Sequence, residues 1–76
     1  MSAVADHAET PASLVRMANQ IASNAEHKDH ELAAGLVAEH LRDFWAPSMR
    51  ERLMAYVDAG GEGLSALALD ALNRLR

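Results

Sequence analysis

The segment "NAEHKDHE", residues 24–31, carries the densest group of side chains that could bind a metal ion. His27 and His30 are three residues apart, and Glu26 and Glu31 stand beside them. A usable site needs about three or four converging ligands and further groups that orient them. The segment is also typical of a polar loop between helices. We interpret these histidines as solvated loop residues, with a small metal or ligand carrier as the alternative.

The rest of the sequence offers no recognisable catalytic arrangement. It has no cysteine and a single lysine, and most of its serines stand where helices are expected to begin. Nucleophilic catalysis needs a nucleophile held beside a base, which this pattern does not indicate. The glycine-rich stretch Gly60-Gly61-Glu62-Gly63 lacks the Lys-Ser/Thr pair of a phosphate-binding loop. The chain is therefore expected to be no enzyme by itself, and to bind no metal and no cofactor.

The length and charge of the chain limit the classes of molecule that it could bind. A chain of 76 residues forms one small domain, which buries only about 60% of its unfolded surface. Without disulfides, such a domain usually gains stability from a partner. Its net charge of −4 does not suit nucleic acid. It has no apolar run of the ~20 residues that a membrane span needs. Lack of cysteine and of a signal segment favours a cytoplasmic location.

Every apolar pattern in the chain has a helical period, which predicts an all-α fold. We expect a compact bundle of about four helices, roughly at residues 11–25, 30–45, 48–59 and 65–75. Residues 10–76 would be a single helical domain, and residues 1–9 a flexible N-terminal tail. Thr10 is the expected N-cap of the first helix, with Pro11 at its first position, and Asp29 is the expected N-cap of the second.

Proline and glycine mark the other helix boundaries. Pro47 is expected to end the second helix, because the residue before a proline avoids the α region. Ser48 and Glu51 have the spacing of a capping box for the third helix. Alternatively, Pro47 is its first residue and Ala46 its N-cap. Gly60-Gly61 is expected to end the third helix in a left-handed turn.

The second helix has a wider apolar surface than one small domain requires. Leu32 and Leu36 extend its apolar arc to roughly 240°, whereas about 100° is enough to face a core. In the first helix, Met17 is expected on the core face and Asn19 on the polar face. Leu69 falls outside the apolar face of the last helix. These exposed apolar positions predict several neighbours, and a homo-oligomer when the chain is isolated.

The segment "HLRDFWAPSMRERL", residues 40–53, contains two of the three aromatic residues of the chain. Adjacent side chains on a helix point about 100° apart, so Phe44 and Trp45 cannot both enter the core. Tryptophan and arginine dominate binding hot spots. The expected partner interface comprises Arg42, Trp45, Pro47, Met49, Arg50 and Arg52. The alternative is that Trp45 packs at the end of the bundle.

Three segments together resemble one known family. They are "LVRMANQIA" at 14–22, "HLRDFWAPSMRERL" at 40–53 and "AGGEGLSALALDAL" at 59–72. In order and spacing they are similar to the delta subunit of NAD-dependent, molybdenum-containing formate dehydrogenases, over roughly residues 14–75. The family commonly has Asp where this chain has Ala46, a change that removes an N-cap worth about 1 kcal/mol.

The resemblance implies a non-catalytic accessory subunit of a cytoplasmic complex. In such complexes the larger subunits carry the molybdopterin guanine dinucleotide, the iron-sulfur clusters and the FMN. The delta subunit is implied to bind none of these, and to stabilise the complex or help assemble it, with the alpha subunit as its expected partner. A transient assembly chaperone for the alpha subunit is the alternative.

Overall fold

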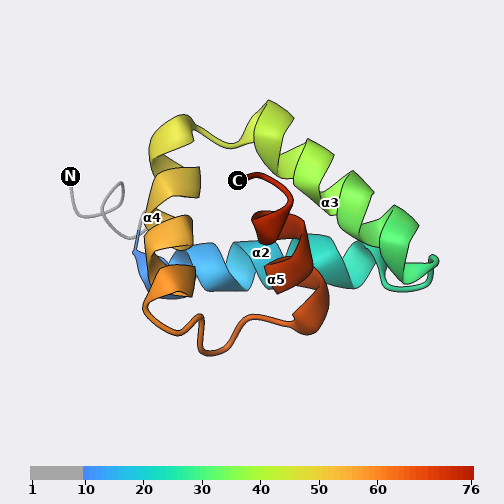
Figure 1. The fold of residues 1–76 in the computed structure, drawn as a ribbon, viewed down its shortest axis with the longest axis horizontal. Helices are drawn as coiled ribbons and strands as arrows, with labels where there is room; N and C mark the ends of the chain where they lie inside the picture. Colours follow the sequence, from blue (N-terminus) through green and yellow to red (C-terminus); the bar gives the residue numbers. More distant parts are fainter. Residues whose placement is uncertain (1–9) are drawn as a thin grey trace.

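The computed structural model describes residues 10–76, so the tail expected at residues 1–9 lies outside the described part. The described chain forms four α-helices and no strand. They are α2 (Pro11–Ala25), α3 (His30–Phe44), α4 (Pro47–Asp58) and α5 (Ala66–Asn73) (Figure 1). The predicted all-α fold of four helices is confirmed. No helix within residues 10–76 has the length and apolar character needed to cross a membrane.

The helices are arranged as a triangle with a fourth helix across it. Figure 1 shows α3 and α4 diverging from the turn before Pro47, each reaching toward a different end of α2. The short helix α5 packs on both α2 and α3, while α4 packs mainly on α2. The core between them is built from leucines and many alanines. Its largest fully buried side chains are Leu14, Val37, Leu41, Leu53 and Leu72.

Small side chains allow α3 and α5 to approach closely. Ala34 and Ala38 of α3 are buried, as are Ala68 and Ala71 of α5. The separation of two packed helices depends on the side chains at their contact, so alanine permits the shortest distances. The core therefore depends on close helix packing more than on bulky side chains.

The starts of the helices agree only in part with the sequence patterns. Thr10 caps α2 as predicted, since its Oγ1 accepts a hydrogen bond of 3.2 Å from the Ser13 N–H. Asp29 occupies the N-cap of α3 without a side-chain capping bond. The capping box at Ser48 is wrong, because α4 begins at Pro47 with Ala46 as its N-cap. The proline ring holds φ near the helical value and lacks the N–H that a first helical residue leaves unpaired.

The end of α4 is fixed by two glycines, as predicted. The Gly61 N–H donates to the Tyr56 carbonyl at 2.9 Å, and the Gly60 N–H donates to the Val57 carbonyl at 3.0 Å. This pair of bonds is a Schellman motif, which requires positive φ. The φ angles of Gly60 and Gly61 are 136° and 64°. The prediction that Leu69 is exposed is wrong, because this turn lies against it and leaves it half-buried.

Asn19 joins α2 to the loop between α4 and α5. Its Nδ2 donates to the Gly63 carbonyl at 2.8 Å, and its Oδ1 accepts from the Ser65 N–H at 2.9 Å. Ser65 in turn caps α5, since its Oγ accepts from the Ala68 N–H at 3.1 Å. Asn19, expected on the polar face of the first helix, is thus half-buried against this loop. One amide side chain positions both the loop and the first turn of α5.

We expect Asn19→Ala to lower the free energy of unfolding by about 1–3 kcal/mol, because two hydrogen bonds disappear together. Urea denaturation followed by circular dichroism measures the change. The neighbouring exposed residue Gln20 supplies the control, since Gln20→Ala should stay within about 0.5 kcal/mol of the unmodified chain. Equal stability of the two variants would show that the Asn19 contacts contribute nothing.

Candidate functional site

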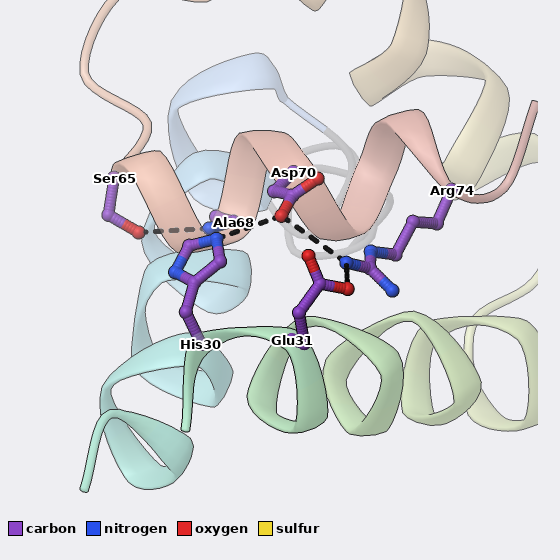
Figure 2. A network of polar contacts seen from close by, with 6 residues as sticks. All are labelled: His30, Glu31, Ser65, Ala68, Asp70 and Arg74. Carbon is purple, nitrogen blue, oxygen red and sulfur yellow. Dashed lines mark hydrogen bonds and ion pairs between the residues drawn. The ribbon is translucent and has the colours of Figure 1, made fainter. Parts of the chain in front are cut away.

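His30 and Glu31 begin α3 and contact α5, as Figure 2 shows. The His30 Nε2 donates to Asp70 Oδ2 at 2.8 Å, since a carboxylate at this distance can only accept. The Arg74 Nη2 donates to Glu31 Oε1 at 2.6 Å and lies 3.6 Å from Asp70 Oδ2. Within residues 10–76 no three His, Cys, Asp or Glu side chains form a group that could hold a metal ion. These residues link two helices across the surface.

The contacts shift the pKa values of two of these groups. The pKa of Asp70 lies below its ordinary value of 3.8, chiefly because His30 donates a hydrogen bond to it, and the Arg74 charge adds to the effect against some desolvation. The pKa of Arg74 is raised, first by its hydrogen bond to Glu31, and again desolvation opposes the shift. The side chains of His30 and Glu31 are 56% and 79% exposed, and those of Asp70 and Arg74 are 36% and 33% exposed, so solvent screens the network and it orients α5 more than it stabilises the fold.

We expect Asp70→Asn to change how stability depends on pH. A carboxyl whose pKa is lower in the folded chain stabilises the fold above its unfolded value and loses this effect as pH falls through the folded value. The difference in unfolding free energy between the unmodified chain and Asp70→Asn should therefore be constant from neutral pH to just above pH 3.8, and shrink below it. Urea denaturation at a series of pH values measures it; a difference that does not shrink below pH 3.8 would contradict the assignment.

Trp45 and Phe44 lie in opposite environments at the end of α3. The Trp45 side chain is 6% exposed and belongs to the core, whereas Phe44 is 74% exposed. The helix ends at Phe44, and Trp45 has an extended backbone with φ −90° and ψ 141°. This change of direction places the indole against the core. It corrects the expectation of a surface role for Trp45 and leaves Phe44 as the accessible aromatic side chain.

Arg50 caps the C-terminal end of α3 from the neighbouring helix. Its Nη1 donates to the carbonyls of Leu41, Arg42 and Trp45, at 3.3, 2.7 and 3.2 Å. The last carbonyls of a helix have no partner within it and carry a partial negative charge, so a guanidinium suits them. Arg50 therefore stabilises the corner between α3 and α4.

The other residues of the expected interface surround this corner. Arg42, Pro47 and Arg52 are exposed, whereas Met49 is half-buried against the core. Hydrogen bonds from Arg50 join Arg42 and Trp45 at the corner, and Arg42, Pro47 and Arg52 are the three residues of the expected set that are exposed.

A groove between α2 and α3 opens beside the corner, and we call it the α2–α3 groove. Its wider part has a volume of about 570 Å³ and its continuation one of about 210 Å³. Both parts share Ile21 and His40, so they form one depression. The His40 ring lies 4.9 Å from the Phe44 ring, centroid to centroid. His40 is an exposed residue of the groove wall.

A comparison with known protein families gives a match to this chain. The family model of the NADH-dependent formate dehydrogenase delta subunit, FdsD, matches residues 13–72, from the first turn of α2 to the last turn of α5. The chain belongs to this delta-subunit family. No curated protein and no solved structure matches it. The resemblance read from the three sequence segments is confirmed.

The delta-subunit region matched by the family model contains an uncovered apolar stripe. The exposed large hydrophobic side chains within residues 10–76 are Met17, Leu32, Leu36 and Phe44, with exposed fractions of 38, 55, 40 and 74%. Leu32, Leu36 and Phe44 are separated by multiples of four residues, so they lie along one side of α3. The wide apolar arc expected for this helix is thus only partly covered. The expectation that Met17 enters the core is wrong, since it lies on the groove wall.

The sequence pattern did not predict the positions of two residues of this delta-subunit fold. Asn19 has no periodic signal, because its partners Gly63 and Ser65 are more than forty positions away. The exposure of Phe44 could have been predicted from the proline that follows Trp45 and Ala46. A proline ends the helix early, so the side chain of Trp45 departs from the helical pattern. The exposure of each of these positions depends on the tertiary fold.

Proposed function

We propose that the chain is a non-catalytic accessory subunit that binds a cytoplasmic, NAD-dependent, molybdenum-containing formate dehydrogenase and stabilises it or helps assemble it. The family match over residues 13–72 carries this proposal. The uncovered apolar stripe on α3 supports it, since contiguous exposed apolar surface marks sites where proteins meet. A short chain with such a surface gains stability from a partner.

The redox groups would belong to the other subunits of the complex. These are the molybdopterin guanine dinucleotide, the iron-sulfur clusters and the FMN, with the alpha subunit as the proposed partner. Iron-sulfur clusters are held mainly by cysteine thiolates, and this chain contains no cysteine. The division supports a role in binding and assembly.

The corner between α3 and α4 is one part of the proposed docking surface. Arg42, Pro47 and Arg52 are exposed there and can contact a partner. Trp45 fills the core beneath them, and Arg50 holds the end of α3. Arginine at an interface offers several donors in a fixed plane, which suits carboxylates and carbonyls of another protein. The two buried or capping residues would act by keeping this corner in shape.

The test is to purify the tagged full chain from the cells that produce it, identify the proteins that accompany it by mass spectrometry, and assay the eluate for formate-dependent NAD reduction. Recovery of active enzyme containing the large subunits supports a permanent subunit. Recovery with the cofactor-free alpha subunit alone supports the assembly chaperone. Recovery without any formate dehydrogenase subunit contradicts the proposal.

A further inference from the structure

The α2–α3 groove has a shape that suits the packing of another helix. On α2, Met17 and Ile21 line it four residues apart. On α3, Leu36 and Phe44 line it with His40 between them. A rise of 1.5 Å per residue makes the step between successive side chains about 6 Å on each wall. This spacing matches the side-chain ridges of an incoming helix, which pack into such grooves.

The walls of the groove exclude strand addition as a way of binding a peptide segment. An extended segment binds by adding a strand to a sheet edge, where backbone groups are free to pair. Residues 10–76 contain no strand, and both walls are helices whose backbone groups bond within each helix. The groove can therefore offer only side chains, chiefly apolar ones. Affinity would come from apolar anchors that the occupant brings at helical spacing.

The two edges of the groove have opposite charge. Arg16 lines the α2 side. On the α3 side, Glu39 lies three residues after Leu36, and Asp43 lies three residues after His40, so both flank the stripe. All three charged residues are exposed, and none of them forms a salt bridge within residues 10–76. Their charges remain available to a partner, with a positive edge on α2 and a negative edge on α3.

We propose that the α2–α3 groove binds an amphipathic helix of a large formate dehydrogenase subunit, with a carboxylate facing Arg16 and a Lys or Arg facing Glu39 and Asp43. The proposal rests on the proposed function, because it names the surface that such a subunit would contact. A second copy of the chain fits less well, since two grooves placed face to face would leave the hollow between them unfilled. A convex helix fills it and satisfies both charged edges.

The decisive experiment places a photo-cross-linking amino acid at position 36 of the full chain within the assembled complex. Leu36 is 40% exposed on the groove wall, so the replacement does not disturb the core. The expected product joins position 36 to a helical peptide of a large subunit that has apolar residues three or four apart and an acidic residue on one side. A cross-link to a second copy of this chain, or none in an intact complex, would overturn the proposal.

Binding variants give an independent measure. Phe44→Ala should weaken binding of the large subunit about 30-fold, as expected for an anchor at an interface hot spot. Arg16→Glu should also weaken it, and a Lys at the facing carboxylate of the partner should restore it. Circular dichroism confirms that each variant is folded, which is expected because both side chains are exposed.

Lys28→Glu is the matched control, since it reverses an exposed charge outside both the groove and the corner and should leave binding unchanged. Arg42→Glu tests the corner itself. Loss of binding in Arg42→Glu but not in the groove variants would assign docking to the corner and overturn the groove proposal, while the proposed function stands. Failure of the unmodified chain to recover any large subunit would instead contradict the proposed function itself.

Discussion

Replacing Trp45 with alanine is expected to lower the free energy of unfolding by about 3–5 kcal/mol, as large aromatic truncations in protein cores do. The indole is only 6% exposed and fills the end of the core below the turn between α3 and α4. At roughly 0.05–0.15 kcal/mol per residue, a domain of this size has a total stability of about 4–11 kcal/mol, so the variant should lose a large share of it. Thermal and urea denaturation of the isolated chain measure this loss.

Phe44→Ala supplies a matched control, because it removes a neighbouring aromatic ring that is 74% exposed. Its effect on the free energy of unfolding should stay within about 0.5 kcal/mol. The pair of variants thus separates folding from binding: Trp45 acts on the stability of the isolated chain, and Phe44 on the complex. A stable Trp45→Ala chain alongside an unfolded Phe44→Ala chain would reverse the assignment of the two rings.

Leu53→Ala is expected to destabilise the chain by about 2–5 kcal/mol. Leu53 is the one fully buried residue in α4, and its exposed fraction is 0%. Since α4 packs chiefly on α2, removal of this side chain should also release α4 locally. Hydrogen exchange should accelerate first in the amides of residues 50–58, while those of α3 remain protected.

Glu51→Ala, an exposed change in the same helix, is the control for Leu53→Ala and should leave both stability and exchange nearly unchanged. Uniform acceleration of exchange throughout α2, α3 and α4 in Leu53→Ala would show that α4 does not open separately. The chain would then unfold only as one cooperative unit.

The helices could be predicted from the sequence because their boundaries depend on local chemistry. Thr10 and Pro11 start α2, and Gly60 with Gly61 ends α4 through positive φ angles. The start of α4 shows the limit of this reasoning. The capping pattern predicted Ser48 as the N-cap, yet the pre-set φ of Pro47 placed the N-cap two residues earlier, at Ala46.

The surface could be predicted less well, because exposure is decided by contacts between distant segments. A helical wheel extended to residue 45 assigns Trp45 a helical direction, but the backbone leaves the helix at that residue and turns the indole inward. Leu69 is covered by the turn at Gly61, and Asn19 by the loop at Gly63. None of these contacts leaves a periodic signal. The wide apolar arc of α3 could be predicted, because that prediction depends only on which side chains are apolar and not on which neighbour each one contacts.

The alanines between α3 and α5 also limit which sequences can keep this fold. Ala34, Ala68 and Ala71 are fully buried, so a larger side chain at any of them would force the two helices apart. Gly35, on the same helix as Ala34, has no atom near the position where a Cβ would stand. Mutational tolerance should therefore alternate between adjacent residues of α3. Random mutagenesis with selection for folded chains would record variation at position 35 and very little at position 34.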